Sequence, residues 1–258
     1  MTMDQQKKII IRVGNLHKSY GNIEAVKGIS FDVYEGEIFG LLGPNGAGKT
    51  TTLEIMETLR EKTEGEVWID GLSVEKDRDQ IKHLIGVQLQ ESGYYPNLKL
   101  VEILDLFAGL YNTRIDPMAL LQKMGLQDKA QVRVDKLSGG QKQRFSLATT
   151  LVNEPKIIFL DEPTVGLDPQ ARRNLWELIR AVRESGATVV MTTHYLDEAE
   201  HLCDRVGIMD EGRIIKIGSP DALIHDLIQT GFKRHKVMKE ASLEDVFLEL
   251  TGKELREE

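Results

Sequence analysis

Two segments of this chain combine residue types that bind phosphate groups. The first segment, the phosphate loop, fits the pattern G-x-x-x-x-G-K-[ST] and lies between a predicted strand and a predicted helix. Its glycines let the backbone wrap a phosphate, Lys49 can reach the β- and γ-phosphates, and the Thr50 hydroxyl can ligate Mg²⁺. The phosphate loop consists of Gly43, Pro44, Asn45, Gly46, Ala47, Gly48, Lys49 and Thr50.

The second segment, the LSGGQ segment, is a Ser-Gly-Gly run that opens a predicted helix. It offers free backbone N–H groups, no bulky side chains and the positive end of a helix dipole, which together favour an anion. One nucleotide needs only one such cradle, so two different cradles suggest that each serves a nucleotide shared with another copy. The LSGGQ segment consists of Leu137, Ser138, Gly139, Gly140 and Gln141.

An acidic pair follows an apolar strand about a hundred residues after the phosphate loop. Asp161 stands where a protein with such a loop places a second carboxylate contact to Mg²⁺. Glu162 would then lie beside the γ-phosphate, where it can orient and deprotonate a water molecule. The alternative is a solvated acidic pair at a strand end, and the phosphate loop weighs against it.

Three further polar or aromatic residues are weaker candidates. His194 follows a predicted strand and can touch the γ-phosphate from the end of that strand, although a lone histidine there is usually structural. Tyr20 could stack on an adenine ring, and the ordinary explanation is an aromatic side chain in a core. Gln90 is a weak candidate by itself, because glutamines are common in loops.

The surrounding pattern predicts a mostly parallel sheet covered on both faces and divided by a helical insert. Short strands are expected over 9–39, with the strand 37–42 running into the phosphate loop and a helix from Lys49 to about Arg60. Asp116-Pro117 predicts a helix start that Gly125 closes. The remaining expected elements are a strand and turn at 66–71, helices over 92–152, strands at 156–161 and 187–191, and a helix between those two strands.

The C-terminal tail has two candidate amphipathic helices. The first begins at Ser219-Pro220-Asp221, and the second begins at Ser242 with a capping-box pattern in which Asp245 takes the usual Glu/Gln position. Packing against the parent domain is the ordinary explanation for both apolar faces.

Composition limits the classes of protein that this chain could be. With 258 residues, 41% hydrophobic and 29% charged, it is typical of a soluble globular protein, and no apolar run approaches the ~20 residues that span a bilayer. Any membrane role must therefore come through a partner. The net charge of −8 weighs against a general nucleic-acid binder, and the basic cluster 233–236 is interpreted as a solvated face. A single cysteine, Cys203, fits a reducing cytoplasm.

Taken in order along the chain, these motifs resemble the ATP-binding subunits of ABC transporters over nearly the whole length. The resemblance implies an α/β fold: a P-loop NTPase (RecA-like) core with an antiparallel β subdomain and an inserted helical subdomain. It divides the chain into 1–91 (β subdomain and first half of the core), 92–152 (helical subdomain), 153–220 (second half of the core) and 221–258 (helical tail). The motifs that carry it are Tyr20, GPNGAGKT at 43–50, Gln90, LSGGQ at 137–141, IIFLDE at 157–162, GLD at 166–168 and His194.

The resemblance also implies a role for each candidate residue. Glu162 is expected to be the general base, His194 a γ-phosphate switch, and Gln90 a contact to Mg²⁺ or the attacking water where the membrane partner docks. Mg²⁺ would be held by Thr50, Gln90 and Asp161. ATP contacts are expected from Tyr20, the phosphate loop with Thr51, Ser138, Gly139, Gly140 and Gln141 of a second copy, and Asp168 in a loop that crosses the dimer interface.

Two segments narrow the resemblance to bacterial drug- and lipid-export ATPases, in which the membrane-spanning half is a separate chain. These segments are 192–200 (TTHYLDEAE) and 243–252 (LEDVFLELTG). The implied protein is a homodimer or heterodimer with ATP and Mg²⁺, on the inner face of the cell membrane through a permease partner, without nucleic acid. Lys99 departs from the Thr usual in such proteins and loses a side-chain N-cap for the helix holding Glu102.

Two alternatives remain open. An importer ATPase shares all the motifs, and only the tail and the GLDP context favour export. A soluble ABC ATPase acting on ribosomes usually carries two cassettes in one chain, and one acting in DNA repair needs a long coiled coil between its halves. This chain has one cassette and a short insert, and its acidic charge adds modest weight against both.

Overall fold

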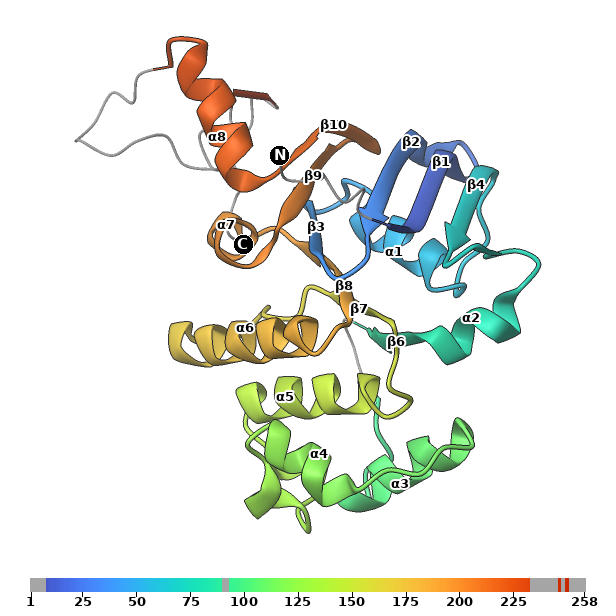
Figure 1. Ribbon diagram of the computed structural model, residues 1–258, viewed down its shortest axis with the longest axis vertical. Coiled ribbons are helices and arrows are strands. Elements are labelled where there is room, and N and C mark those ends of the chain that lie inside the picture. Colours follow the sequence, from blue (N-terminus) through green and yellow to red (C-terminus); the bar gives the residue numbers. More distant parts are fainter. Residues whose placement is uncertain (1–7, 90–92, 233–245, 247–248, 251–258) are drawn as a thin grey trace, which may run out of the picture.

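The computed structural model describes residues 8–89, 93–232, 246, 249 and 250, and Figure 1 shows their arrangement around a central six-stranded sheet. The strand order is β10-β9-β3-β8-β7-β6, in which the five strands from β9 to β6 are parallel and β10 is antiparallel to β9. The strands are β3 (Ile38–Leu42), β6 (Ile85–Gln88), β7 (Ile157–Asp161), β8 (Thr188–Thr193), β9 (Arg205–Asp210) and β10 (Arg213–Gly218).

Both faces of this sheet are covered, which explains why its central strands are apolar without alternation. Every residue of β3, β7 and β8 is buried. Alternate side chains of these strands enter two different hydrophobic clusters: Phe159 and Val190 belong to one, and Leu160 and Met191 to the other. A parallel sheet with helices or a second sheet on each face has this pattern.

A four-stranded antiparallel sheet covers one face. Its order is β2-β1-β4-β5, and it shares a hydrophobic cluster with helix α1 and the central strands. Figure 1 shows this sheet beside β3 and α1 at the upper right. The elements are β1 (Ile9–Tyr20), β2 (Ile23–Tyr34), β4 (Glu64–Ile69) and β5 (Leu72–Ser73), followed by the short helix α2 (Arg78–Leu84).

Helices cover the other face and form a further layer beneath it. In Figure 1, α6 lies below the central sheet, and α5, α4 and α3 lie below α6. This arrangement fits the predicted helical insert; the exact division of the chain into four units stays a prediction. The helices are α3 (Leu100–Leu110), α4 (Pro117–Lys123), α5 (Gly139–Thr150), α6 (Pro169–Glu184), α7 (Leu196–Leu202) and α8 (Pro220–Gln229), with 3₁₀ turns at Gln127–Lys129 and Val134–Lys136.

Helix α1 (Lys49–Met56) ends earlier than the predicted end near Arg60, so that boundary was wrong. The chain turns at Thr58, which has a left-handed φ of 63°. The N–H groups of Leu59 and Arg60 both donate to the carbonyl of Glu54, at 2.9 and 3.1 Å, and this closes the helix instead of extending it.

Helix α3 compensates for the missing side-chain cap at Lys99. A lysine ammonium has no acceptor, but the Glu102 carboxylate accepts the Lys99 N–H at 2.8 Å. The next two N–H groups, of Leu100 and Val101, donate to the carbonyls of Val132 and Ala130 at 3.0 and 3.2 Å. The helix start is therefore satisfied by backbone from a neighbouring loop.

The C-terminal part of the described chain packs on the helical face. Helix α8 begins as predicted, with the Ser219 hydroxyl accepting the Ala222 N–H at 3.2 Å. Leu223, Leu227 and Val246 are buried in the larger cluster. Most of the second predicted tail helix, and the basic cluster 233–236, lie outside the described residues. Within the described residues, no helix is long and apolar enough to span a bilayer.

The start of helix α4 offers a direct test of its predicted cap. The Asp116 carboxylate accepts the N–H groups of Met118 and Ala119 at 2.9 and 3.2 Å. We expect Asp116→Ala to lower the free energy of unfolding by about 1 kcal/mol, measured by urea denaturation. Asp105→Ala, at an exposed position of α3, is the control; equal losses for both variants would contradict the capping role.

Candidate functional site

The phosphate loop connects β3 to α1 and wraps around the Lys49 ammonium. Lys49 is 4% exposed, and its Nζ donates to the carbonyls of Gly43 and Pro44 at 2.8 and 3.1 Å. The loop requires glycine at two points: a Cβ on Gly43 would meet the Met209 carbonyl at 2.2 Å, and Gly48 has a φ of 97°. The local sequence thus fixes a tight loop with a buried cation at its centre.

Asp161 ends strand β7 beside the first turn of α1. The Thr50 hydroxyl donates to Asp161 Oδ1 at 3.2 Å, and the Thr192 hydroxyl donates to the same oxygen. Burial raises the pKa of Asp161, and the hydrogen bonds from Thr192 and Thr50 oppose this shift. A hydroxyl and a carboxylate oxygen that already lie within hydrogen-bond distance are a donor set that suits Mg²⁺.

Thr192 is a site residue that the sequence analysis did not single out. It lies on β8, next to β7, and its hydroxyl also accepts the Glu162 N–H at 3.0 Å. One hydroxyl therefore fixes both the Asp161 carboxylate and the backbone of Glu162. A sequence feature that could have indicated it is the pair of threonines, Thr192 and Thr193, at the carboxyl end of an apolar run.

Glu162 brings its carboxylate between two nitrogen groups. Its φ of 47° turns the chain sharply after β7, and Oε1 lies 3.4 Å from Lys49 Nζ and 3.2 Å from His194 Nδ1. Contact with the His194 ring lowers the pKa of Glu162; burial opposes this, and the Lys49 charge adds to it. Burial lowers the pKa of Lys49, and Glu162 opposes that shift. Glu162 is therefore an ionised carboxylate at neutral pH, the form that accepts a proton.

The structure brings together five of the residues that the sequence singled out: Lys49, Thr50, Asp161, Glu162 and His194. They lie where β3, β7 and β8 end, because parallel strands present their carboxyl ends at one edge of the sheet. Among the described residues, no cluster of three or more His, Cys, Asp and Glu side chains could hold a metal ion. An ion held by Thr50 and Asp161 would complete its shell with phosphate and water oxygens, as Mg²⁺ usually does.

The LSGGQ segment forms the N-terminus of α5, in the separate helical layer. The Ser138 hydroxyl accepts the Gln141 N–H at 3.4 Å, and the Gln141 side chain accepts the Ser138 N–H at 2.9 Å. This capping box leaves the N–H groups of Gly139 and Gly140 without an intrahelical partner. The segment thus has the form of an anion cradle, in a different layer of the fold from α1 (Figure 1).

Asp168 lies near the LSGGQ segment. Its Oδ1 accepts the N–H groups of Gln170 and Ala171, both at 2.9 Å, and so caps helix α6. A Cβ on Gly140 would lie 3.1 Å from the Ala171 Cβ, so the glycine allows α5 and α6 to approach closely. Contact of Asp168 with a nucleotide stays a prediction.

Tyr20, at the end of β1, is not in a core. Its side chain is 40% exposed, and the Lys18 ammonium and the Arg60 guanidinium lie 5.0 and 5.3 Å from its ring centre. The ordinary core explanation is therefore wrong for Tyr20, and stacking on adenine stays a prediction. Gln90 lies outside the described residues.

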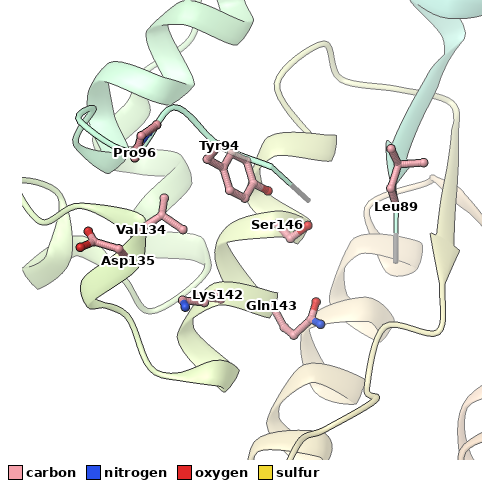
Figure 2. A pocket seen from close by; sticks show the side chains of 8 residues that line it. All are labelled: Leu89, Tyr94, Pro96, Val134, Asp135, Lys142, Gln143 and Ser146. Carbon is pink, nitrogen blue, oxygen red and sulfur yellow. The ribbon is translucent and has the colours of Figure 1, made fainter. Parts of the chain in front are cut away.

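A groove opens between Leu89 and helix α5, where the core meets the helical layer. Figure 2 shows its lining: Leu89 follows strand β6, Lys142, Gln143 and Ser146 lie on α5, and the other side chains come from the segments before α3 and before α5. Its surface mixes apolar groups with one acidic and one basic side chain. The lining residues are Leu89, Tyr94, Pro96, Val134, Asp135, Lys142, Gln143 and Ser146.

Fold and site together define a P-loop NTPase. A comparison with protein families narrows this class further. Residues 26–165 match the family described as ABC transporter. Because this match covers more than half of the chain, the protein belongs to that family.

Two curated relatives are similar over most of the chain. The linearmycin resistance ATP-binding protein LnrL of Bacillus subtilis (strain 168) is 38% identical, over 81% of this chain and 69% of the relative. The Nod factor export ATP-binding protein I of Burkholderia orbicola (strain AU 1054) is 36% identical, over 94% of this chain and 97% of the relative.

One similar solved structure shows an ATP-binding cassette in a post-hydrolysis state. It is the dimeric structure of an ATP-binding cassette bound to ADP and Pi; it is 30% identical, has a TM-score of 0.73, and covers 81% of this chain and 98% of that chain. With the family match, this identifies the protein as an ABC ATPase that binds ATP.

Glu57, at the end of α1, is a second residue that the sequence analysis missed. Its side chain is 2% exposed, and its Oε1 has no hydrogen-bond partner within the described part of the chain. Burial, and then the charges of Asp161 and Glu54, raises the pKa of Glu57 to about 8. The sequence does not indicate that Glu57 is buried or that its pKa is raised, because both depend on how α1 packs under the sheet.

This pKa predicts how stability varies with pH. Between the usual value of 4.5 and about 8, the folded protein keeps a proton that the unfolded chain has lost. The free energy of unfolding should therefore fall as pH rises through this window, by up to ~1.4 kcal/mol per pH unit. We expect Glu57→Gln to remove this pH dependence. The free energy of unfolding of the variant should exceed that of wild type most near pH 8. Denaturation at several pH values checks this, with exposed Glu184→Gln as the control; a pH slope unchanged in Glu57→Gln would contradict it.

Proposed function

We propose that this chain is the ATP-hydrolysing subunit of an exporter and drives a drug, lipid or similar small molecule through a separate membrane subunit. The observation that carries the enzymatic part is the contact of the Glu162 carboxylate with both Lys49 and His194 at the edge of the sheet. Export is supported by the two relatives, whose names refer to linearmycin resistance and to Nod factor export.

Each residue of the cluster has a distinct task in this proposal. Lys49 binds the β- and γ-phosphates, and Thr50 with Asp161 would hold Mg²⁺, which supplies charge neutralisation on the phosphate oxygens. Glu162 accepts the proton of the attacking water. His194 orients Glu162 and contacts the γ-phosphate. The low pKa of Glu162 keeps the carboxylate unprotonated before the water loses its proton.

A second copy completes the site. The free N–H groups of Gly139 and Gly140, with the Ser138 hydroxyl, cap the γ-phosphate that the other copy holds through Lys49. Two ATP molecules then lie between two head-to-tail copies, as a homodimer or with a paralogue. The dimeric state of the similar cassette bound to ADP and Pi supports this arrangement.

The groove of Figure 2 is the docking site for the membrane partner in this proposal. It is lined by Leu89, which precedes Gln90 in the sequence, and by residues of α5, so a docked segment would touch both the core and the helical layer. The subunit would lie on the inner face of the cell membrane and need no nucleic acid. A neighbouring gene for a six-span membrane protein supports export; one for a soluble binding protein favours import.

Glu162→Gln tests the role of the base. We expect the variant to bind ATP with near wild-type affinity, to lose at least ~100-fold in kcat, and to accumulate as an ATP-dependent dimer. Phosphate release and light scattering measure these properties. Glu177→Gln, on the exposed side of α6, is the control, and full turnover by Glu162→Gln would remove Glu162 as the base.

Ser138→Arg tests the shared site. The variant keeps Lys49 and the phosphate loop, so ATP affinity of the monomer should be unchanged. The bulky side chain should block the cradle for the second copy, so dimerisation and hydrolysis should both be lost. If Ser138→Arg hydrolyses ATP and dimerises like wild type, the two cradles do not serve one nucleotide.

A further inference from the structure

Helix α5 holds the chain on both sides of residues 90–92. Before that segment, the Gln88 side-chain amide donates to the Gln143 side-chain oxygen at 2.6 Å. After it, the Tyr94 ring packs on Phe145 with ring centres 5.3 Å apart, and the Tyr94 hydroxyl lies 3.3 Å from that of Thr149. The helix that begins with the LSGGQ segment is therefore tied directly to the strand that leads to Gln90.

The Gln88–Gln143 bond joins two halves of the proposed site. Gln88 ends strand β6 and pairs in register with Leu160 of β7, the residue before Asp161. Gln143 lies in the second turn of α5, whose first turn holds the free N–H groups of Gly139 and Gly140. One side-chain hydrogen bond thus connects the strand pair that positions Asp161 to the helix that positions the second cradle.

Burial makes this bond costly to lose. Gln88 is 2% exposed, and its Oε1 has no partner within the described part of the chain. If the Gln143 oxygen were removed, the Gln88 amide would lose its described acceptor as well, and a buried polar group without a partner is strongly disfavoured. The pair therefore favours one orientation of α5 relative to the sheet.

We propose that Gln88 and Gln143 are positioning residues that set the orientation of the LSGGQ segment for closure around ATP. ATP binding by a single copy uses Lys49 and does not require this orientation. Closure does require it, because the cradle of one copy must meet the phosphate held by the other. The pair is tested in the isolated subunit, without the membrane partner.

The test compares two replacements of similar length at position 143. Gln143→Met removes the acceptor, and Gln143→Glu keeps an oxygen for the Gln88 amide. In a Glu162→Gln background with saturating ATP, we expect Gln143→Met to weaken dimerisation about tenfold and Gln143→Glu to stay near the parent. In the chain that keeps the wild-type Glu162, Gln143→Met should lower kcat without changing the ATP affinity of the monomer. Sedimentation, phosphate release and a fluorescent ATP analogue measure these three properties.

A double-mutant cycle assigns the effect to the pair. Gln88→Met alone should weaken dimerisation about as much as Gln143→Met, and the double variant should be no worse than either. Gln122→Met, at an exposed position of α4, is the matched control and should behave as the parent. Wild-type dimerisation by Gln143→Met, an equal defect in Gln143→Glu, or additive effects in the cycle would overturn the proposal. So would a loss of monomer ATP affinity in Gln143→Met, because that would indicate a general structural defect.

These outcomes are separate from those of the shared-site proposal. If Glu162→Gln itself forms no ATP-dependent dimer, the dimer proposal fails before the positioning pair is reached. If that parent dimerises and Gln143→Met dimerises equally well, only the positioning proposal fails.

Discussion

The buried ammonium of Lys49 is the constraint on which the site depends. A cation with 4% exposure is stable only if oxygen atoms replace its lost water, and the structure supplies two loop carbonyls and the Glu162 carboxylate. The carbonyls fix the shape of the phosphate loop, and the carboxylate fixes the chain after β7. An anion that enters the loop meets a cation that has already been dehydrated, so their attraction is stronger than in water.

The parallel sheet lets these groups meet. Lys49 comes after β3, and Thr192 lies near the end of β8. Asp161 is the last residue of β7, and Glu162 follows it. Many residues separate these three strands in the sequence. Register brings them to one edge: Leu42 pairs with Thr193, and Asp161 pairs with Thr192. Because these strands are buried on both faces, a shift of register would bury the wrong side chains, and the apolar packing therefore also holds the polar site in place.

Local patterns made much of this structure predictable. The phosphate loop and the cap at Asp116 each depend on neighbours a few residues away, and both have the expected local geometry. The acidic pair could be recognised from the apolar run before it, although the contact of Asp161 with Thr50 joins residues far apart in the sequence. Thr192, Glu57 and the Gln88–Gln143 pair were missed, because each depends on which strands and helices lie side by side. The end of α1 was missed for another reason: Thr58 adopts a left-handed φ that a β-branched residue rarely has, so nothing in its side chain marks the turn.

The two caps near the proposed interface differ in what they can still bind. The Ser138 hydroxyl accepts the Gln141 N–H, yet a hydroxyl also has a proton to donate, so capping α5 and binding a phosphate oxygen are compatible. The Asp168 carboxylate has acceptors only, and Oδ1 already caps α6 with two bonds. A bare phosphate would repel it. If Asp168 reaches across to the other copy, its partner there must be a hydrogen-bond donor such as a hydroxyl, an N–H group or a water molecule. The LSGGQ segment and Asp168 therefore suit different partners, although they lie close together. The LSGGQ segment suits a phosphate, and Asp168 suits the hydrogen-bond donors around that phosphate.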